Sequence, residues 1–138
     1  MTQIVAFDRE RHTKQVVDLW REAFGYETAH NEPRLVIEKK LAANDGLFWV
    51  AVNEDLVVGT VMAGYDGHRG WIYSLAVGPS HRRQGIGSLL LSHAEGRLVT
   101  LGCLKINLQI ADGNEHVQGF YQANGYAVEK RISMGKRI

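Results

Sequence analysis

Residues 81–96 read HRRQGIGSLLLSHAEG, which sets two arginines and two glycines directly before a leucine-rich run. Glycine inside a helix costs about 1 kcal/mol relative to alanine, so Gly85 and Gly87 must serve another purpose where this helix begins. A helix start leaves backbone N–H groups without partners at the positive end of the helix dipole. Such a start suits a phosphate or pyrophosphate, and Arg82 and Arg83 would add charged donors. An ordinary loop with solvated arginines is the alternative.

Two common nucleotide-binding patterns do not fit this stretch. The dinucleotide fingerprint needs a third glycine three residues after the second, and this chain has Leu90 there. The phosphate loop of nucleoside triphosphatases needs Gly-Lys followed by Ser or Thr, and no such run occurs in the sequence. Any anion site at residues 81–88 must therefore be of another kind.

Length and composition indicate one globular domain. The chain has 138 residues, of which 45% are hydrophobic and 22% charged, so residues 1–138 can bury a substantial core. A net charge of +1 provides no broad field for nucleic acid or an anionic membrane, and neither is an expected partner. The single cysteine, Cys103, excludes an internal disulfide framework. Without a signal-like or membrane-spanning apolar run, a cytoplasmic protein is expected.

The polar residues contain no metal-binding pattern. The six histidines include no pair four residues apart and no cysteine partner at a zinc spacing, so no metal is expected. Cys103 is interpreted as a small buried apolar residue.

Hydrophobic periodicity predicts a mixed sheet flanked by helices. Apolar and β-branched runs predict strands at residues 3–8, 47–53, 57–65, 71–77 and 105–110, with one or two more in the tail after residue 125. Helical patterns predict helices from Arg9 to Phe24, from Pro33 through Ala42, after Gly85, and from Asn114 to Gly125. The long helix after Gly85 is expected to bury Ile86, Leu89, Leu90, Ala94, Leu98 and Leu101 on one face.

Read as Arg82-x-x-Gly85-x-Gly87, the opening stretch resembles the acetyl-CoA loop of the GNAT superfamily of N-acetyltransferases. The segment NEHVQGFYQANGY, residues 114–126, resembles the closing N…FYxxxGF/Y motif of that family. The resemblance runs from about Val57 to Tyr126, whereas the first 45 residues match only in element order. It implies a single GNAT-like α/β (α+β) domain, whose central mixed, mostly antiparallel sheet of six to seven strands is flanked by about four helices. It also implies a parallel, splayed strand pair at the cofactor site.

The resemblance further implies how acetyl-CoA binds as co-substrate. The pantetheine arm would pair with backbone groups of Leu75, Ala76 and Val77. The pyrophosphate would lie on the loop and helix start, at Arg82, Arg83, Gln84, Gly85, Ile86, Gly87 and Ser88. Asn114 matches the residue that hydrogen-bonds the pantetheine arm, with a plain N-cap role as the alternative.

Tyr121 matches the general acid of the family. A phenol with a reference pKa of about 10 is protonated at neutral pH and can donate to the departing thiolate. A core tyrosine packed beside Phe120 is the alternative interpretation.

The general base cannot be transferred from the family. Where other members carry a carboxylate on the fourth or fifth strand, this chain has Trp71 or Gln109. Other candidates lie in loops, and each is more commonly a solvated residue: Glu32, His30, Asp66 and His68. Tyr65, Trp71 and Tyr73 suggest the aromatic wall of an acceptor pocket. Tyr65 and Tyr73 fit the hydrophobic core equally well.

The resemblance therefore predicts an acetyltransferase that moves an acetyl group directly from acetyl-CoA to an amine of a small molecule or peptide N-terminus. The first alternative is a non-catalytic acyl-CoA-binding sensor of the same fold. The second is a nucleic-acid-binding domain that uses its arginines, and the near-neutral charge argues against it. Strand edges in such sheets often pair, so a homodimer is a further expectation.

Overall fold

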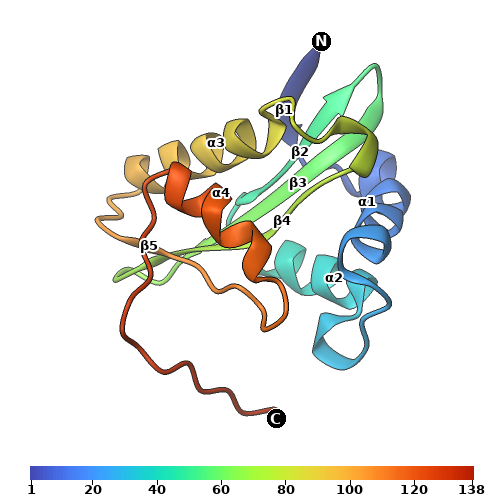
Figure 1. Cartoon of the computed structure of the whole chain (residues 1–138). Coiled ribbons are helices and arrows are strands. Elements are labelled where there is room, and N and C mark those ends of the chain that lie inside the picture. Colours follow the sequence, from blue (N-terminus) through green and yellow to red (C-terminus); the bar gives the residue numbers. More distant parts are fainter. The chain divides into compact units, whose positions relative to one another are not determined.

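The computed structural model describes residues 1–138, which form two compact units at residues 1–108 and 109–138 (Figure 1). The first unit contains the whole sheet and three helices, and the second contains one short helix and the C-terminal tail. No helix is long and apolar enough to span a membrane.

The sheet has five strands in the order of the sequence. They are β1 (Thr2–Ala6), β2 (Phe48–Asn53), β3 (Leu56–Tyr65), β4 (Gly70–Val77) and β5 (Ile106–Asn107). The first four pair antiparallel, whereas β5 runs parallel to β4. The expected mixed, mostly antiparallel sheet is thus confirmed, but the expected number of six to seven strands is wrong.

The missing strands belong to the last part of the sequence. Residues 127–138 form neither helix nor strand, and the predicted strand at 105–110 shortens to β5. The tail leaves its apolar side chains exposed at Val128, Ile132, Met134 and Ile138. Alternating apolar residues give only a propensity, because a strand also needs a neighbouring ladder to satisfy its backbone.

The helices of the first unit begin where the sequence provides caps. In α1 (Arg9–Phe24), the Asp8 carboxylate accepts the first free backbone N–H groups. In α2 (Pro33–Ala43), Glu32 does the same, and proline fills the first helical position as predicted. The third helix, α3 (Ile86–Thr100), has no side-chain cap.

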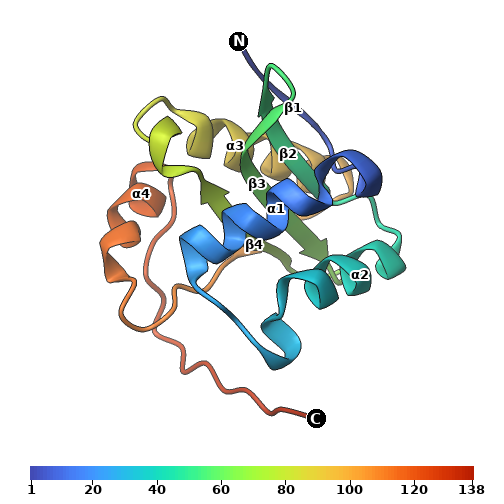
Figure 2. The ribbon, with the colours of Figure 1, turned by 90° about the vertical axis from the view of Figure 1, so that its right-hand side faces the viewer.

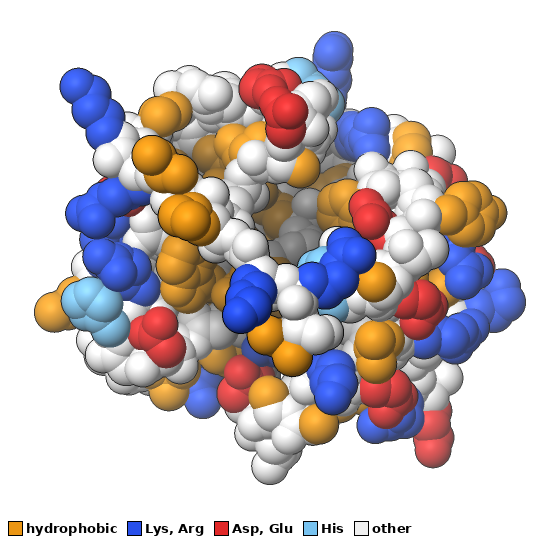
Figure 3. All heavy atoms as spheres, turned by 90° about the horizontal axis from the view of Figure 1, so that it is seen from below, with side chains coloured by type: hydrophobic (Ala, Val, Ile, Leu, Met, Phe, Trp, Pro, Cys, Tyr) orange, Lys and Arg blue, Asp and Glu red, His pale blue; other side chains and the backbone are white.

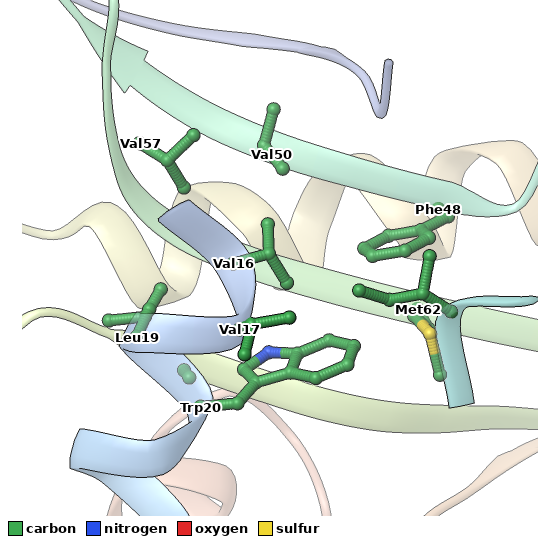
Figure 4. Close-up of a cluster of buried hydrophobic side chains, with 10 residues drawn as sticks. Val16, Val17, Leu19, Trp20, Phe48, Val50, Val57 and Met62 are labelled. Atoms are coloured by element: carbon green, nitrogen blue, oxygen red, sulfur yellow. The ribbon is translucent and has the colours of Figure 1, made fainter. Parts of the chain in front are cut away.

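Helices α1 and α2 lie on one face of the sheet and α3 on the other (Figure 2). On the first face, Val16, Val17 and Trp20 of α1 pack with Ile37 of α2 against strand residues such as Phe48 (Figure 4). This cluster is almost entirely excluded from water, and hydrophobic burial of this kind is the main stabilising term of a small domain.

The buried face of α3 differs in part from the predicted one. Four of the expected residues are buried, but Leu89 and Leu101 are exposed, and Leu91 is buried instead. Leu89 and Leu91 lie at opposite edges of the stripe, so the buried face is rotated slightly about the helix axis, and Leu101 follows the last helical residue, Thr100. Cys103, just after this helix, is buried and unpaired as expected.

Strand β4 contains a β-bulge. Thr60 of β3 pairs with Ala76 of β4, and Met62 pairs with Tyr73. One residue of β3 therefore lies opposite two residues of β4, at positions 74–75, and an extra residue of this kind bends the strand that carries it. The sequence predicted an unbroken strand at 71–77 and missed the bulge, because a small polar residue within an apolar run is not a specific signal.

Glycine at position 59 is required by packing, which leads to a stability prediction. A Cβ there would lie 2.8 Å from Leu90 Cδ1 and 3.0 Å from the Ala76 carbonyl oxygen. We expect Gly59→Ala to lower the free energy of unfolding by about 1–3 kcal/mol through overpacking. Gly96→Ala, in exposed α3 with nothing within 4 Å, should instead raise it by about 0.5–1 kcal/mol. Urea unfolding of both variants checks the prediction, and equal shifts would contradict it.

Candidate functional site

The loop between β4 and α3 turns twice through left-handed backbone. Arg83 has φ of 64° and Gly85 has φ of 79°. A side chain at position 85 would meet no atom within 4 Å, so glycine is needed there for its backbone angle and not for lack of space. Gly85 is therefore the residue at which the chain turns into the helix.

The first turn of α3 presents unpaired backbone donors. The N–H group of Leu89 bonds to the Gly85 carbonyl at 3.0 Å, and no side chain caps the groups before it. The N–H groups of Ile86 and Gly87 therefore point out of the helix without a partner in the chain. Together with the helix dipole these groups make the start of α3 suitable for an anion, and the anion site itself stays a prediction.

The two arginines of the loop have different positions. Arg82 Nε donates to the Val77 carbonyl at 3.2 Å and so ties the loop to the last residue of β4. Arg83 has an exposed side chain in no ion pair. On the face seen in Figure 3, basic and acidic side chains are interspersed.

Strand β4 has an unpaired edge directly before this loop. The parallel ladder to β5 covers only Gly70 and Trp71. From there to Val77 no strand follows on that side of β4, and this part of the strand contains the bulge. An extended ligand can add to such an edge by hydrogen bonding to the backbone. Among the three residues predicted to contact the pantetheine arm, Ala76 is buried in the core, while Leu75 and Val77 are half-buried.

The second unit, described by itself, contains the other two predicted site residues. Asn114 begins a 3₁₀ turn at Glu115–Val117 through its carbonyl, but its side chain forms no cap hydrogen bond. Asn114 therefore occupies the N-cap position of this turn, as the alternative interpretation had it, but without a capping hydrogen bond from its side chain.

Tyr121 lies in α4 (Gln118–Ala123) between two aromatic rings. The rings of Phe120 and Tyr126 meet it edge-on, with centroids at 5.1 and 5.9 Å. Burial raises the pKa of the Tyr121 phenol. Its hydroxyl forms no hydrogen bond within the chain, so a protonated donor is held in place by packing and not by a polar partner.

The carboxylates suggested as general bases serve as structural caps. Glu32 accepts the N–H groups of the first turn of α2, and Asp66 accepts those of Arg69 and His68. These hydrogen bonds lower the pKa of both carboxyl groups. A carboxylate of lowered pKa is a weaker base, so neither is suited to take a proton from an amine.

The aromatic residues suggested as a pocket wall do not all share one face. Trp71 pairs with Gly64, and Tyr65 pairs with Gly70. Successive strand residues point to opposite faces, so Tyr65 lies on the face opposite Trp71. Tyr73 lies on the same face as Trp71, the face toward which a side chain at Gly64 would point, since a Cβ at Gly64 would be 3.5 Å from Tyr73 Cε2. The expected wall is therefore wrong for Tyr65, and only Trp71 and Tyr73 share a face.

A helix start with free backbone N–H groups is a common binding site for phosphate groups in α/β proteins. The family model "Acetyltransferase (GNAT) family" matches residues 13–126. The chain belongs to this family, and the resemblance seen in the sequence is confirmed. No group of three His, Cys, Asp or Glu side chains is arranged to hold a metal ion.

Solved structures share this fold along almost the whole chain. The PaiA N-acetyltransferase of Thermoplasma acidophilum in complex with coenzyme A is 17% identical with a TM-score of 0.80, covering 96% of this chain and 93% of that one. Glucosamine-6-phosphate N-acetyltransferase of Arabidopsis thaliana is 19% identical with a TM-score of 0.73, covering 99% and 98%. A transcriptional regulator of Bacillus halodurans is 21% identical with a TM-score of 0.79, covering 100% of both chains. At these identities the likeness establishes the fold.

Proposed function

We propose that this protein is an acetyl-CoA-dependent N-acetyltransferase that transfers the acetyl group directly to an amine of a small molecule or peptide N-terminus. One observation carries the proposal: the unpaired edge of β4 leads directly into an uncapped helix start within residues 70–88. Coenzyme A has a pyrophosphate attached to an extended arm that contains amide groups. The two binding features follow one another in the order that such a ligand needs.

In this proposal the chain binds the two parts of acetyl-CoA by different means. The N–H groups of Ile86 and Gly87 would hold the pyrophosphate, with Arg83 as a charged donor. The backbone of Leu75 and Val77 would pair with the pantetheine arm. The uncapped helix and the open edge fit this ligand, because α3 has no side-chain cap and no strand pairs with β4 beyond Trp71 on the side of β5.

Transfer breaks the thioester C–S bond and forms an amide C–N bond. Tyr121 would donate its proton to the departing sulfur, and its raised pKa keeps the phenol protonated at neutral pH. The amine must lose a proton before it attacks. The capping roles of Glu32 and Asp66 make these carboxylates weak bases, so the proton would go to water, with His30 and His68 as the remaining candidate bases. No covalent intermediate on the protein is needed.

The lack of a strong base leads to a prediction about the acceptor. Deprotonation at pH 7 costs about 4.6 kcal/mol for a lysine side chain of pKa about 10.4, but about 1–1.4 kcal/mol for an α-amine. We therefore expect α-amines, or other amines of lowered pKa, to react faster than protein lysines, with a rate that rises as pH passes the pKa of the amine. Initial rates over pH 6–9 test this, and Glu32→Gln should leave the slope unchanged. Faster reaction of lysine at pH 7 would contradict it.

A thiol-release assay tests the function itself. Purified protein with acetyl-CoA is screened against amino acids, polyamines, aminoglycosides and peptide N-termini, and coenzyme A binding is measured in parallel by calorimetry. Binding with amine-dependent thiol release supports the acetyltransferase. Binding of coenzyme A without thiol release with any amine supports the alternative, a non-catalytic acyl-CoA sensor. The presence of Trp71 and Gln109 where other family members carry a carboxylate base favours this alternative. The cytoplasmic location and the homodimer stay predictions.

A further inference from the structure

A buried hydrogen-bond relay holds the bulge of β4. The hydroxyl of Thr60 donates to the Ser74 carbonyl at 2.8 Å, and Trp20 Nε1 donates to the Thr60 hydroxyl at 2.8 Å. Thr60 is fully buried and Trp20 is 3% exposed, with its indole inside the core cluster drawn in Figure 4. Three segments distant in the sequence (α1, β3 and β4) are joined by two hydrogen bonds.

The relay has a fixed direction. A hydroxyl has one proton, and an indole nitrogen can only donate, so Thr60 must accept from Trp20 and donate to Ser74. Such a chain strengthens each of its bonds in a medium of low polarity. Ser74 has φ of 50°, a left-handed conformation that costs energy for a residue other than glycine. The relay therefore supports a strained residue that would otherwise relax.

The strained residue lies at the point where β4 changes its surroundings. The parallel ladder with β5 ends at Trp71, and the bulge follows at positions 74–75. The bulge resets the alternation of the strand, because Tyr73 and Ala76, three residues apart, lie on the same face of the sheet. It therefore determines in which direction the N–H and C=O groups of residues 75–77 point.

We propose that Trp20 and Thr60 are positioning residues for acyl-CoA. By fixing the Ser74 carbonyl they set the direction of the backbone groups that pair with the pantetheine arm. The inference rests on the proposed function, since it requires that arm to lie along β4. Neither side chain touches the ligand, because both are buried, so their effect must be confined to the part of the ligand that contacts β4.

The test compares two ligands on variants that separate the hydroxyl from its packing. Thr60→Val keeps the shape and removes the hydroxyl, whereas Thr60→Ser keeps the hydroxyl and removes a methyl group. Calorimetry measures affinity for coenzyme A and for its phospho-ADP portion, which has the pyrophosphate but no pantetheine. We expect Thr60→Val to weaken coenzyme A binding at least fivefold with phospho-ADP binding unchanged, and Thr60→Ser to bind both like the wild type.

Two further variants control for folding. Trp20→Phe removes the N–H donor and keeps an aromatic ring, and we expect it to weaken coenzyme A binding at least twofold with phospho-ADP unchanged. It decides the question if Thr60→Val does not fold. Ile37→Val, in the same core but on α2, should lower the unfolding temperature without changing either affinity.

The outcomes separate the relay from the proposed function. Wild-type coenzyme A affinity in folded Thr60→Val, or in Trp20→Phe if that variant alone folds, would overturn the relay. A parallel loss of both ligands would also overturn it, because the effect would then be general. If the wild type binds no coenzyme A, the proposed function itself fails.

Discussion

Tyr121→Phe is expected to lower kcat by a factor of about 10² or more while coenzyme A affinity stays nearly constant. The substitution keeps the ring and its edge-on contacts with Phe120 and Tyr126, and removes only the proton donor. A general acid contributes roughly 10²–10⁴ in rate. Because the hydroxyl bonds to no other group of the chain, its removal leaves no buried partner unsatisfied. Steady-state thiol release and calorimetry measure the two quantities.

The pH dependence follows from the direction of the pKa shift. Burial raises the Tyr121 pKa, so the phenol stays protonated above its ordinary titration range, and kcat of the wild type should not fall between pH 8 and about 10 from loss of this proton. In Tyr121→Phe the loss should persist at every pH. Tyr126→Phe makes the same change at a position where the family motif accepts either residue, and should stay within about twofold of wild type. Full activity in Tyr121→Phe would make Tyr121 a structural residue.

Local signals in the sequence were sufficient for most of the first unit. The helix from Arg9 to Phe24 has the predicted bounds, because its apolar spacing and its Asp8 cap both act over a few residues. The turn between β2 and β3 was also predicted, although it takes only Glu54 and Asp55, both with positive φ, and leaves Leu56 in the strand. Glycine-rich helix starts are similarly local, and the residues around Gly85 adopt the predicted conformation.

Features that depend on partners far along the chain could not be predicted. The bulge in β4 is supported by Thr60 and Trp20, which lie 14 and 54 positions before Ser74, so no window around Ser74 contains its cause. The short length of β5 and the absence of strands in the tail were missed for the same reason. Whether a segment forms a strand depends on the neighbouring strand it can pair with, and not on its own β propensity alone. The roles of Glu32 and Asp66 as caps became clear only from their hydrogen bonds.

Gly87→Glu is expected to weaken coenzyme A binding at least tenfold, or about 1.4 kcal/mol. The side chain would place a carboxylate in the first turn of α3, where the N–H groups of Ile86 and Gly87 have no partner in the chain. An acidic residue is favourable at a helix start, so the fold should be retained or slightly stabilised. Loss of affinity would then come from competition with the pyrophosphate, and calorimetry together with an unfolding curve separates the two effects.

Gly96→Glu provides a matched control on the same helix. It makes the same substitution nine residues later, about 14 Å along the axis, at an exposed position with nothing within 4 Å. That distance exceeds the screening length at physiological salt, so coenzyme A affinity should be unchanged. Gly87→Gln then separates the effect of side-chain size from that of charge. If it loses as much coenzyme A affinity as Gly87→Glu, the ligand needs close approach to the backbone. If it loses less affinity, the charge of the glutamate dominates. Wild-type affinity in a folded Gly87→Glu protein would show that the pyrophosphate does not bind at the start of α3.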